Sequence, residues 1–204
     1  MEKRSRGRPR EYDRETALNQ AMHVFSTKGF SATAVDDLAE ATGLNRPSLY
    51  NAFGNKESLY RETLDHFVSG LRGEIGRRVV ADPDLKKALM AFYKGALEEY
   101  FSTKPARGCF AFCTAPVESI THPEFQCDIK ALIDELDALW EAKFATGKAS
   151  GKYTSITDAV MSAKLAQSVL HSLAIRARAG ESKASLLRLA TSAAEIMCNS
   201  RHPI

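Results

Sequence analysis

Four different hydrogen-bonding groups fall within six residues of this chain: Arg46, Ser48, Tyr50 and Asn51. A guanidinium, a hydroxyl, a phenol and a carboxamide match the donors and acceptors of base edges and phosphate oxygens. Arg46 is the strongest candidate base reader because a guanidinium forms two parallel hydrogen bonds with guanine. The residue types therefore predict contacts with nucleic acid, provided that one element holds these side chains outward.

The segment that would position them, residues 33–60, has the pattern of two short helices around a turn, followed at once by a third helix. Thr33 is the expected N-cap of the first helix, and Asp36 would complete a capping box. Gly43 falls at the turn, and Asn45 is expected to cap the second helix. The pattern predicts a helix-turn-helix, which presents its second helix to the DNA major groove. An ordinary pair of packed helices joined by a glycine has the same spacing and stays an alternative.

A basic arm precedes this unit. Residues 1–10 carry five positive charges and one negative charge, a net of +4, whereas the whole chain is only +3, so the remainder sums to −1. The segment Arg6-Gly7-Arg8-Pro9 resembles the core of an AT-hook, in which arginines enter a narrow minor groove. We expect the arm to contact DNA through four side chains, although a disordered solubilising tail has the same composition. The four are Arg4, Arg6, Arg8 and Arg10.

A longer ordered pattern carries a family resemblance. It consists of Ala21 to Phe25, Gly29-Phe30, Thr33, Asp37-Leu38-Ala39, Gly43-Leu44, Ser48-Leu49-Tyr50, Phe53, Lys56-Glu57 and Leu59. The segment from about Tyr12 to Val68 thereby resembles the DNA-binding domain of the tetracycline-repressor (TetR) family of bacterial transcription regulators. The resemblance implies that bases or phosphates in the major groove are met by Asn45, Arg46, Ser48, Tyr50 and Asn51, and that Thr33 and Lys56 hold phosphates. One departure is Asn45, where the family commonly has serine, although either residue caps a helix.

The remaining chain predicts an all-α fold, since no alternation typical of strands has a useful length. We expect helices at 14–28, from Asn55 to about Asp82, and at about 84–102, 109–120, 123–145, 156–179 and 182–199. The expected organisation is a basic arm at 1–10, a three-helix DNA-binding domain at 11–71 with its motif at about 34–53, and a larger C-terminal helical domain at 72–204 for effector binding and dimerisation.

Composition sets the broad class. With 204 residues and 44% hydrophobic content, the chain is long enough for one or two domains with their own cores. No apolar run approaches the ~18 residues that span a membrane, and the arginine-rich start lacks the apolar core of a signal peptide. We therefore expect no membrane partner and a cytoplasmic protein, associated with the nucleoid when bound to DNA.

The last two expected helices are rich in small residues interleaved with larger apolar ones. This composition suits a two-fold four-helix interface between two copies of the chain, and an internal core is the equal alternative. A homodimer also follows from function, because two reading helices recognise a palindrome. The stretch 173–180 resembles the end of the penultimate helix of the TetR family, whose members dimerise through their last two helices. The expected interface residues are Leu165, Val169, Leu173, Leu186, Leu189 and Met197.

Aromatic residues gather between positions 84 and 145. Such a set is often plain core, but apolar walls with scattered polar groups also form small-molecule cavities. The family resemblance favours a cavity, since the middle helices of that family usually enclose an inducer. The expected pocket residues for an effector of unknown identity are Phe92, Tyr93, Phe110, Phe112, Phe125, Trp140 and His171.

Two cysteines offer an alternative signal. Cys109 stands at an expected helix start beside Arg107, and Cys113 lies one turn later. A thiolate in that place would have a lowered pKa and could sense oxidants or electrophiles, as in a subset of the TetR family. The other interpretation is a cysteine packed as a small apolar residue. No zinc-finger spacing is present, so we expect neither a metal nor a cofactor.

No phosphate loop, nucleophile elbow or metalloprotease helix is found, which argues against an enzyme. The sequence thus predicts a homodimeric, sequence-specific transcriptional repressor that leaves a palindromic operator when a small effector binds. A thiol-based sensor acting through Cys109 is one alternative. A non-specific architectural DNA-binding protein is the other, and it would bind operator and random DNA equally well.

Overall fold

The structure is a computed structural model that describes residues 13–153, 156 and 158–199. These residues form helices and no strands, as predicted for an all-α chain. The four arginines predicted to form the basic arm, Arg4, Arg6, Arg8 and Arg10, lie outside the described residues. The N-terminal helices are α1 (Arg14–Lys28), α2 (Val35–Thr42), α3 (Arg46–Phe53) and α4 (Lys56–Ile75).

Capping residues set the helix starts in this part of the chain. Asn45 caps α3 as predicted, since its Oδ1 accepts a hydrogen bond from the backbone N–H of Ser48 at 2.9 Å. The cap of α2 differs from the prediction by one residue. Its N-cap is Ala34, whose N–H donates to the Asp37 carboxylate at 3.0 Å. Thr33 instead donates its hydroxyl to the carbonyl of Gly29, at 2.6 Å, which stabilises the turn before α2.

The later helices follow the predicted order, with shorter or longer ends. After a π-helical segment at Gly76–Val80, which continues α4, the chain forms α5 (Leu85–Tyr100), α6 (Phe110–Glu118), α7 (Pro123–Ala149), α8 (Ala159–Arg178) and α9 (Lys183–Met197). The helix predicted at about 123–145 continues further than expected, to Ala149. Gly147 is buried inside α7, and a Cβ there would approach Leu85 Cδ2 to 2.8 Å. Glycine at this point allows close packing of α5 on α7 and does not mark a turn.

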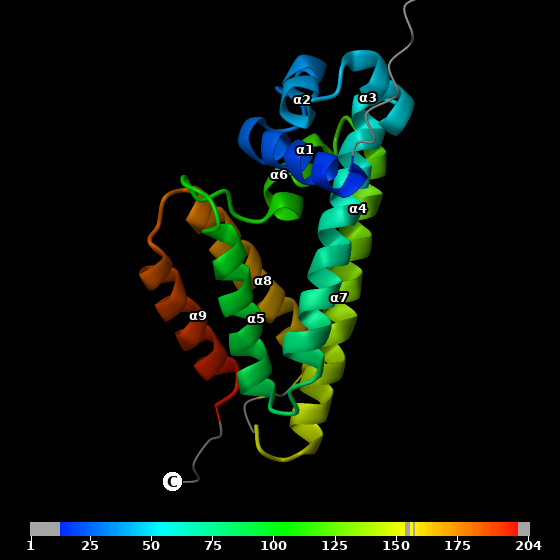
Figure 1. The fold of residues 1–204 in the computed structure, drawn as a ribbon. Helices are drawn as coiled ribbons and strands as arrows, with labels where there is room; N and C mark the ends of the chain where they lie inside the picture. The colour runs from blue at the N-terminus through cyan, green and yellow to red at the C-terminus, as the bar shows by residue number, and fades with distance from the viewer. Residues whose placement is uncertain (1–12, 154–155, 157, 200–204) are drawn as a thin grey trace, which may run out of the picture.

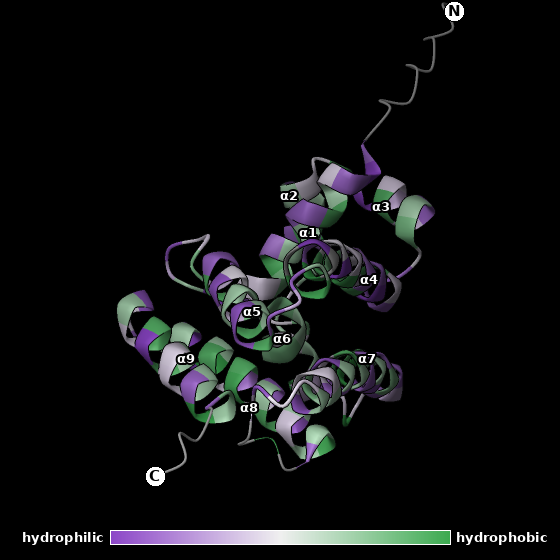
Figure 2. Ribbon diagram, turned by 90° about the horizontal axis from the view of Figure 1, so that it is seen from below, coloured by the Kyte–Doolittle hydropathy of each residue, from purple (hydrophilic) through white to green (hydrophobic). Residues whose placement is uncertain are grey.

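The helices are arranged in a head and a body. Figure 1 shows α1, α2 and α3 at one end of the molecule, with the long α4 and α7 running side by side away from them, joined by the ion pairs Arg61–Asp128 and Arg72–Glu135. Looking along the body, Figure 2 places α5, α8 and α9 on the opposite side. The largest fully buried side chains of the described residues include Tyr60, Tyr93 and Trp140. No helix among the described residues is long and apolar enough to cross a membrane.

Candidate nucleic-acid interface and effector cavity

The outer face of α3 carries the predicted reading side chains. Leu49 and Phe53, on the opposite face of the helix, are 3% and 5% exposed and anchor it in the core of the head. Arg46 and Asn51 are exposed, and Tyr50 is 46% exposed. Ser48 is half-buried. The head therefore presents a guanidinium, a phenol and a carboxamide outward, whereas contact of these groups with DNA stays a prediction.

Arg46 is engaged by a neighbour that the sequence did not indicate. Its Nε and one terminal nitrogen donate to the two carboxylate oxygens of Asp36, near the start of α2. Both side chains are more than half exposed, so the pair lies in the open face of the helix-turn-helix. The hydrogen bonds to Arg46 lower the pKa of Asp36. The candidate base reader thus has an oriented guanidinium plane and an adjacent negative charge.

Two predicted phosphate ligands are used inside the head. Thr33 is 2% exposed, and its hydroxyl donates to the Gly29 carbonyl. The ammonium of Lys56 donates to the carbonyls of Phe30 and Thr33, at 3.1 Å each, and lies 4.4 Å from the centroid of the Phe30 ring. These contacts occupy the Thr33 hydroxyl and two of the three ammonium donors of Lys56, and binding of a phosphate by either residue stays a prediction. Buried backbone carbonyls need partners, and Lys56 supplies them where α4 begins.

Arg14 is a positioning residue that the sequence analysis missed. Its guanidinium donates to both carboxylate oxygens of Glu62, at 2.6 Å each, and to the Ala52 carbonyl at 3.0 Å. It also lies 4.6 Å from the centroid of the Phe53 ring. One side chain of α1 thereby fixes the C-terminal end of α3 against α4. The partners are 38 and 48 residues away, so no local pattern signals the contact.

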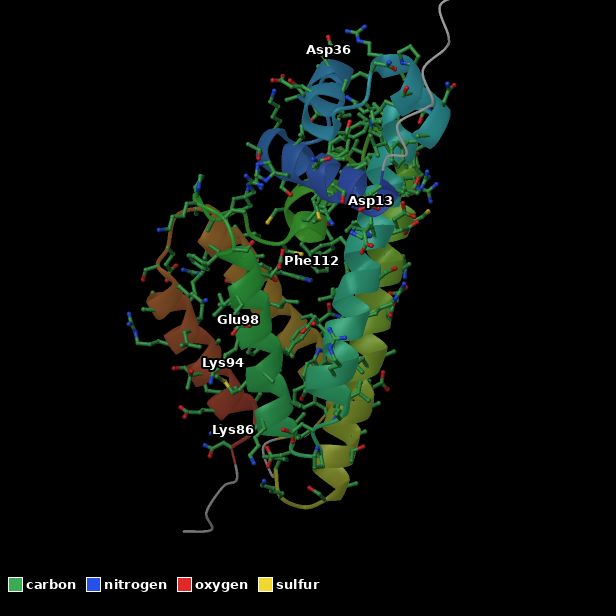
Figure 3. The ribbon with its side chains drawn as sticks, viewed as in Figure 1. Asp13, Asp36, Lys86, Lys94, Glu98 and Phe112 are labelled. Carbon is green, nitrogen blue, oxygen red and sulfur yellow. The ribbon has the colours of Figure 1, made fainter. Side chains whose placement is uncertain are left out.

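A cavity of about 250 Å³ lies where α1, α4, α5, α6 and α8 meet. Phe92 and Phe112, two of the seven predicted pocket residues, line it. Figure 3 shows Phe112 between the head and the body, well away from Asp36 on the outer head. The remaining wall is largely apolar, and much of it comes from α1, α4 and the π-helical segment, for which no pocket residue was predicted. It includes Met22, Phe67, Leu71, Ile75, Val79, Ala96, Tyr100, Cys109 and Leu170.

The other five predicted pocket residues do not line this cavity, because they pack elsewhere. Tyr93 and Trp140 are fully buried, and the Tyr93 hydroxyl donates to the Ala166 carbonyl at 2.9 Å. Phe110 and Phe125 pack against Tyr60 beneath the head, although Phe110 also lines a smaller adjoining hollow. His171 lies behind the wall, with its ring centroid 4.1 Å from that of Phe112.

The cysteine environment contradicts the prediction of a lowered pKa. Cys109 is the N-cap of α6 but is only 4% exposed, and burial raises the pKa of its thiol to about 12. Burial also raises the pKa of Cys113. Arg107 is occupied by His23, with nitrogen–nitrogen distances of 2.6 and 2.9 Å. Desolvation therefore outweighs the helix N-terminus. No group of His, Cys, Asp and Glu in the described part of the chain could hold a metal ion.

The predicted dimer residues divide into three sets, which are fully buried, exposed and partly buried. Leu173 and Leu186 are fully buried between helices of the same chain, so they belong to its own core, which corrects the prediction. Leu165 is 57% exposed and Leu189 is 37% exposed. Val169 and Met197 are partly buried against the core. Further exposed apolar side chains that the prediction omitted on these two helices are Val160, Met161, Ile175 and Ile196.

Specific contacts join the head to the body. Glu118, at the end of α6, accepts hydrogen bonds from the N–H and the hydroxyl of Ser31, at 3.1 and 2.5 Å. The guanidinium of Arg178, at the end of α8, donates to the carbonyls of Ser26 and Arg107, at 3.1 Å each. Through these contacts α6 and α8, which both contribute to the cavity wall, are hydrogen-bonded to the head.

Comparisons with known proteins agree with this architecture. A sequence profile described as bacterial regulatory proteins of the tetR family matches residues 17–63. The HTH-type transcriptional repressor ComR of Escherichia coli (strain K12) is 30% identical over 190 residues, which cover 92% of this chain and 90% of that protein.

Solved structures show the same arrangement of helices. A cysteine mutant of the TetR family transcriptional regulator CifR, complexed with double-strand operator DNA, is 28% identical with a TM-score of 0.80, covering 92% of this chain and 98% of that one. A TetR transcriptional regulator from Chloroflexus aurantiacus J-10-FL is 25% identical with a TM-score of 0.80, covering 91% and 94%. The chain belongs to the TetR family of bacterial regulatory proteins and is a DNA-binding transcriptional regulator.

Proposed function

We propose that this chain is a homodimeric repressor that binds a palindromic operator through α3 and leaves it when a small molecule enters the cavity. The exposed polar face of α3, with Leu49 and Phe53 anchoring its opposite side, carries this proposal. A helix held in this way can enter the major groove with Arg46, Tyr50 and Asn51 foremost. Such a repressor works in the cytoplasm, on the nucleoid.

The exposed apolar residues of α8 and α9 support the homodimer. Met161, Leu165 and Ile175 are spaced by four and ten residues, which places them on one stripe of α8. Leu189 and Ile196 form a similar stripe on α9, seven residues apart. An antiparallel pair with such stripes can bury them against a second copy in a two-fold four-helix interface.

The position of the cavity supports release by an effector. Met22 of α1 and Phe67 and Leu71 of α4 line it; α1 lies in the head, and α4 runs from the head along the body. A ligand that favours a different spacing of α1, α4 and α5 would therefore move the head and change the separation of the two reading helices.

The test begins with an operator selected from a random-sequence DNA library by repeated rounds of binding. The ratio of operator affinity to random-DNA affinity, at fixed salt, should be at least ~10³ for a specific regulator. Arg72→Ala is the control for loss of a positive charge away from α3, because this exposed arginine of α4 pairs with Glu135 of α7. A ratio near unity would contradict the proposal and favour an architectural DNA-binding protein.

A further inference from the structure

The titratable side chains that line the cavity include two carboxylates and one histidine, His66, whose Nε2 lies 3.0 Å from Asn19 Oδ1. Glu74 of α4 and Glu99 of α5 are lining residues, and the described wall contains no lysine and no arginine. An anionic ligand would meet these carboxylates with no lysine or arginine in the wall to attract it, which costs free energy in a partly desolvated site. The charge of the wall therefore discriminates against anions.

The two carboxylates differ in their partners. Glu74 forms an ion pair with the guanidinium of Arg77, which offsets its charge. Glu99 takes part in none of the ion pairs found among the described residues, and its side chain is exposed. It lines both the cavity and the smaller adjoining hollow, as do Asn19 and Met22. Glu99 thus adds an exposed carboxylate to the wall of an apolar space.

The smaller hollow adds the guanidinium of Arg107, whose nitrogens lie 2.6 and 2.9 Å from the ring nitrogens of His23. The cavity itself is walled by aromatic rings, including Phe67, Phe92 and Phe112. Aromatic faces attract cations through their quadrupole, most strongly where water is excluded. Apolar burial, ring faces and an unpaired carboxylate all favour the same kind of guest.

We propose that the cavity takes a lipophilic organic cation, with its apolar body among the rings and its positive charge near Glu99. A quaternary ammonium or protonated amine on a small aromatic or branched aliphatic group has this chemistry. The volume of about 250 Å³ limits the guest to a small molecule. The inference rests on the proposed effector role of this cavity and names the ligand class that would fill it.

Two probes of equal shape separate charge from burial. Phenyltrimethylammonium is a cation, and tert-butylbenzene is its neutral isostere. Binding of each to the full chain is measured by calorimetry in the wild type, Glu99→Gln, Glu74→Gln and the control Glu98→Gln. Glu98 neighbours Glu99 but does not line the cavity, so its substitution removes the same charge from outside the site (Figure 3).

We expect Glu99→Gln to weaken binding of the cation up to about fivefold, the range of a partly exposed charge pair, and to leave the isostere within about twofold. Glu74→Gln should have a smaller effect on the cation because Arg77 already offsets its charge. Glu98→Gln should leave the affinities of both probes unchanged.

Equal effects of Glu99→Gln on the two probes, or no effect on either, would overturn the inference. If the isostere binds and releases the operator while the cation does neither, the ligand class is wrong and the effector role stands. If neither probe binds, the inference falls, whereas operator recognition by α3 is judged separately by the DNA measurements.

Discussion

Asp36 and Arg46 form a two-point ion pair between the first turn of α2 and the first residue of α3. The pair is exposed to solvent, so its contribution to stability is small. Its position matters more than its strength. The carboxylate fixes the plane of the guanidinium that α3 would carry into the major groove, and it places a negative charge on the face that we propose meets DNA.

The first prediction concerns DNA specificity. Arg46→Ala should reduce discrimination at one base pair per half-site by about 1–3 kcal/mol, because a two-point contact with guanine is lost. The measurement is titration of operator variants and random DNA at fixed salt. An equal loss on both kinds of DNA would show that Arg46 contacts a phosphate.

Asp36→Asn is the substitution that matches Arg46→Ala, because it changes the other partner of the same ion pair. It should raise the affinity for random DNA, since it removes a negative charge, and lower the ratio of operator to random affinity, since Arg46 loses its fixed orientation. Asp134→Asn, at an exposed site on α7 in the body, controls for the change in net charge. An unchanged ratio in Asp36→Asn would contradict the positioning role of Asp36.

The second prediction separates the dimer face from the core of the chain. Leu165→Glu places a charge on the exposed stripe of α8 and should convert the dimer to monomers while each chain stays folded. Leu173→Ala, eight residues along the same helix, should instead lower the free energy of unfolding by about 2–5 kcal/mol through a buried cavity. Sedimentation and urea unfolding distinguish the two. A dimeric Leu165→Glu variant would argue against this face as the interface.

The third prediction concerns thiol reactivity. Cys127 is exposed, whereas Cys109 is buried with a pKa raised to about 12. Cys127 should therefore react first with a thiol reagent, and Cys109 should react at least ~10-fold more slowly, since the thiolate is the reacting form. Peptide mass mapping after timed alkylation measures both rates. Faster labelling of Cys109 than of Cys127 would revive the thiol-sensor alternative.

The fourth prediction is a pH dependence at the junction of head and body. Desolvation, and then the nearby Arg107 charge, lower the pKa of His23. A histidine with a lowered folded pKa contributes stability above its unfolded value of about 6.5, and this contribution is lost as the pH falls below that value. Urea unfolding should show a larger loss of stability on acidification in the wild type than in His23→Gln. Equal losses would contradict this role of His23.

Local patterns were sufficient for most of the fold. The 3.6-residue spacing of apolar side chains and the cap at Asn45 predict the helix bounds to within a few residues of those observed. A helix end was predicted wrongly where a glycine can either end a helix or allow close packing. Gly147 has the sequence signature of a helix end, but it lies inside α7 because Leu85 needs the space. The family resemblance was likewise a local matter, carried by the ordered residues of the head.

The sequence by itself determined the helices, the outward face of α3 and the class of DNA-binding regulator, because each depends on neighbours within a turn or two of the chain. Tertiary structure alone decided which aromatic residues line the cavity, that Lys56 serves the head internally, that Asp36 holds Arg46, and that Cys109 is desolvated. These outcomes depend on burial and on partners brought together from distant segments, and periodicity records which face of a helix is apolar but not what packs against it.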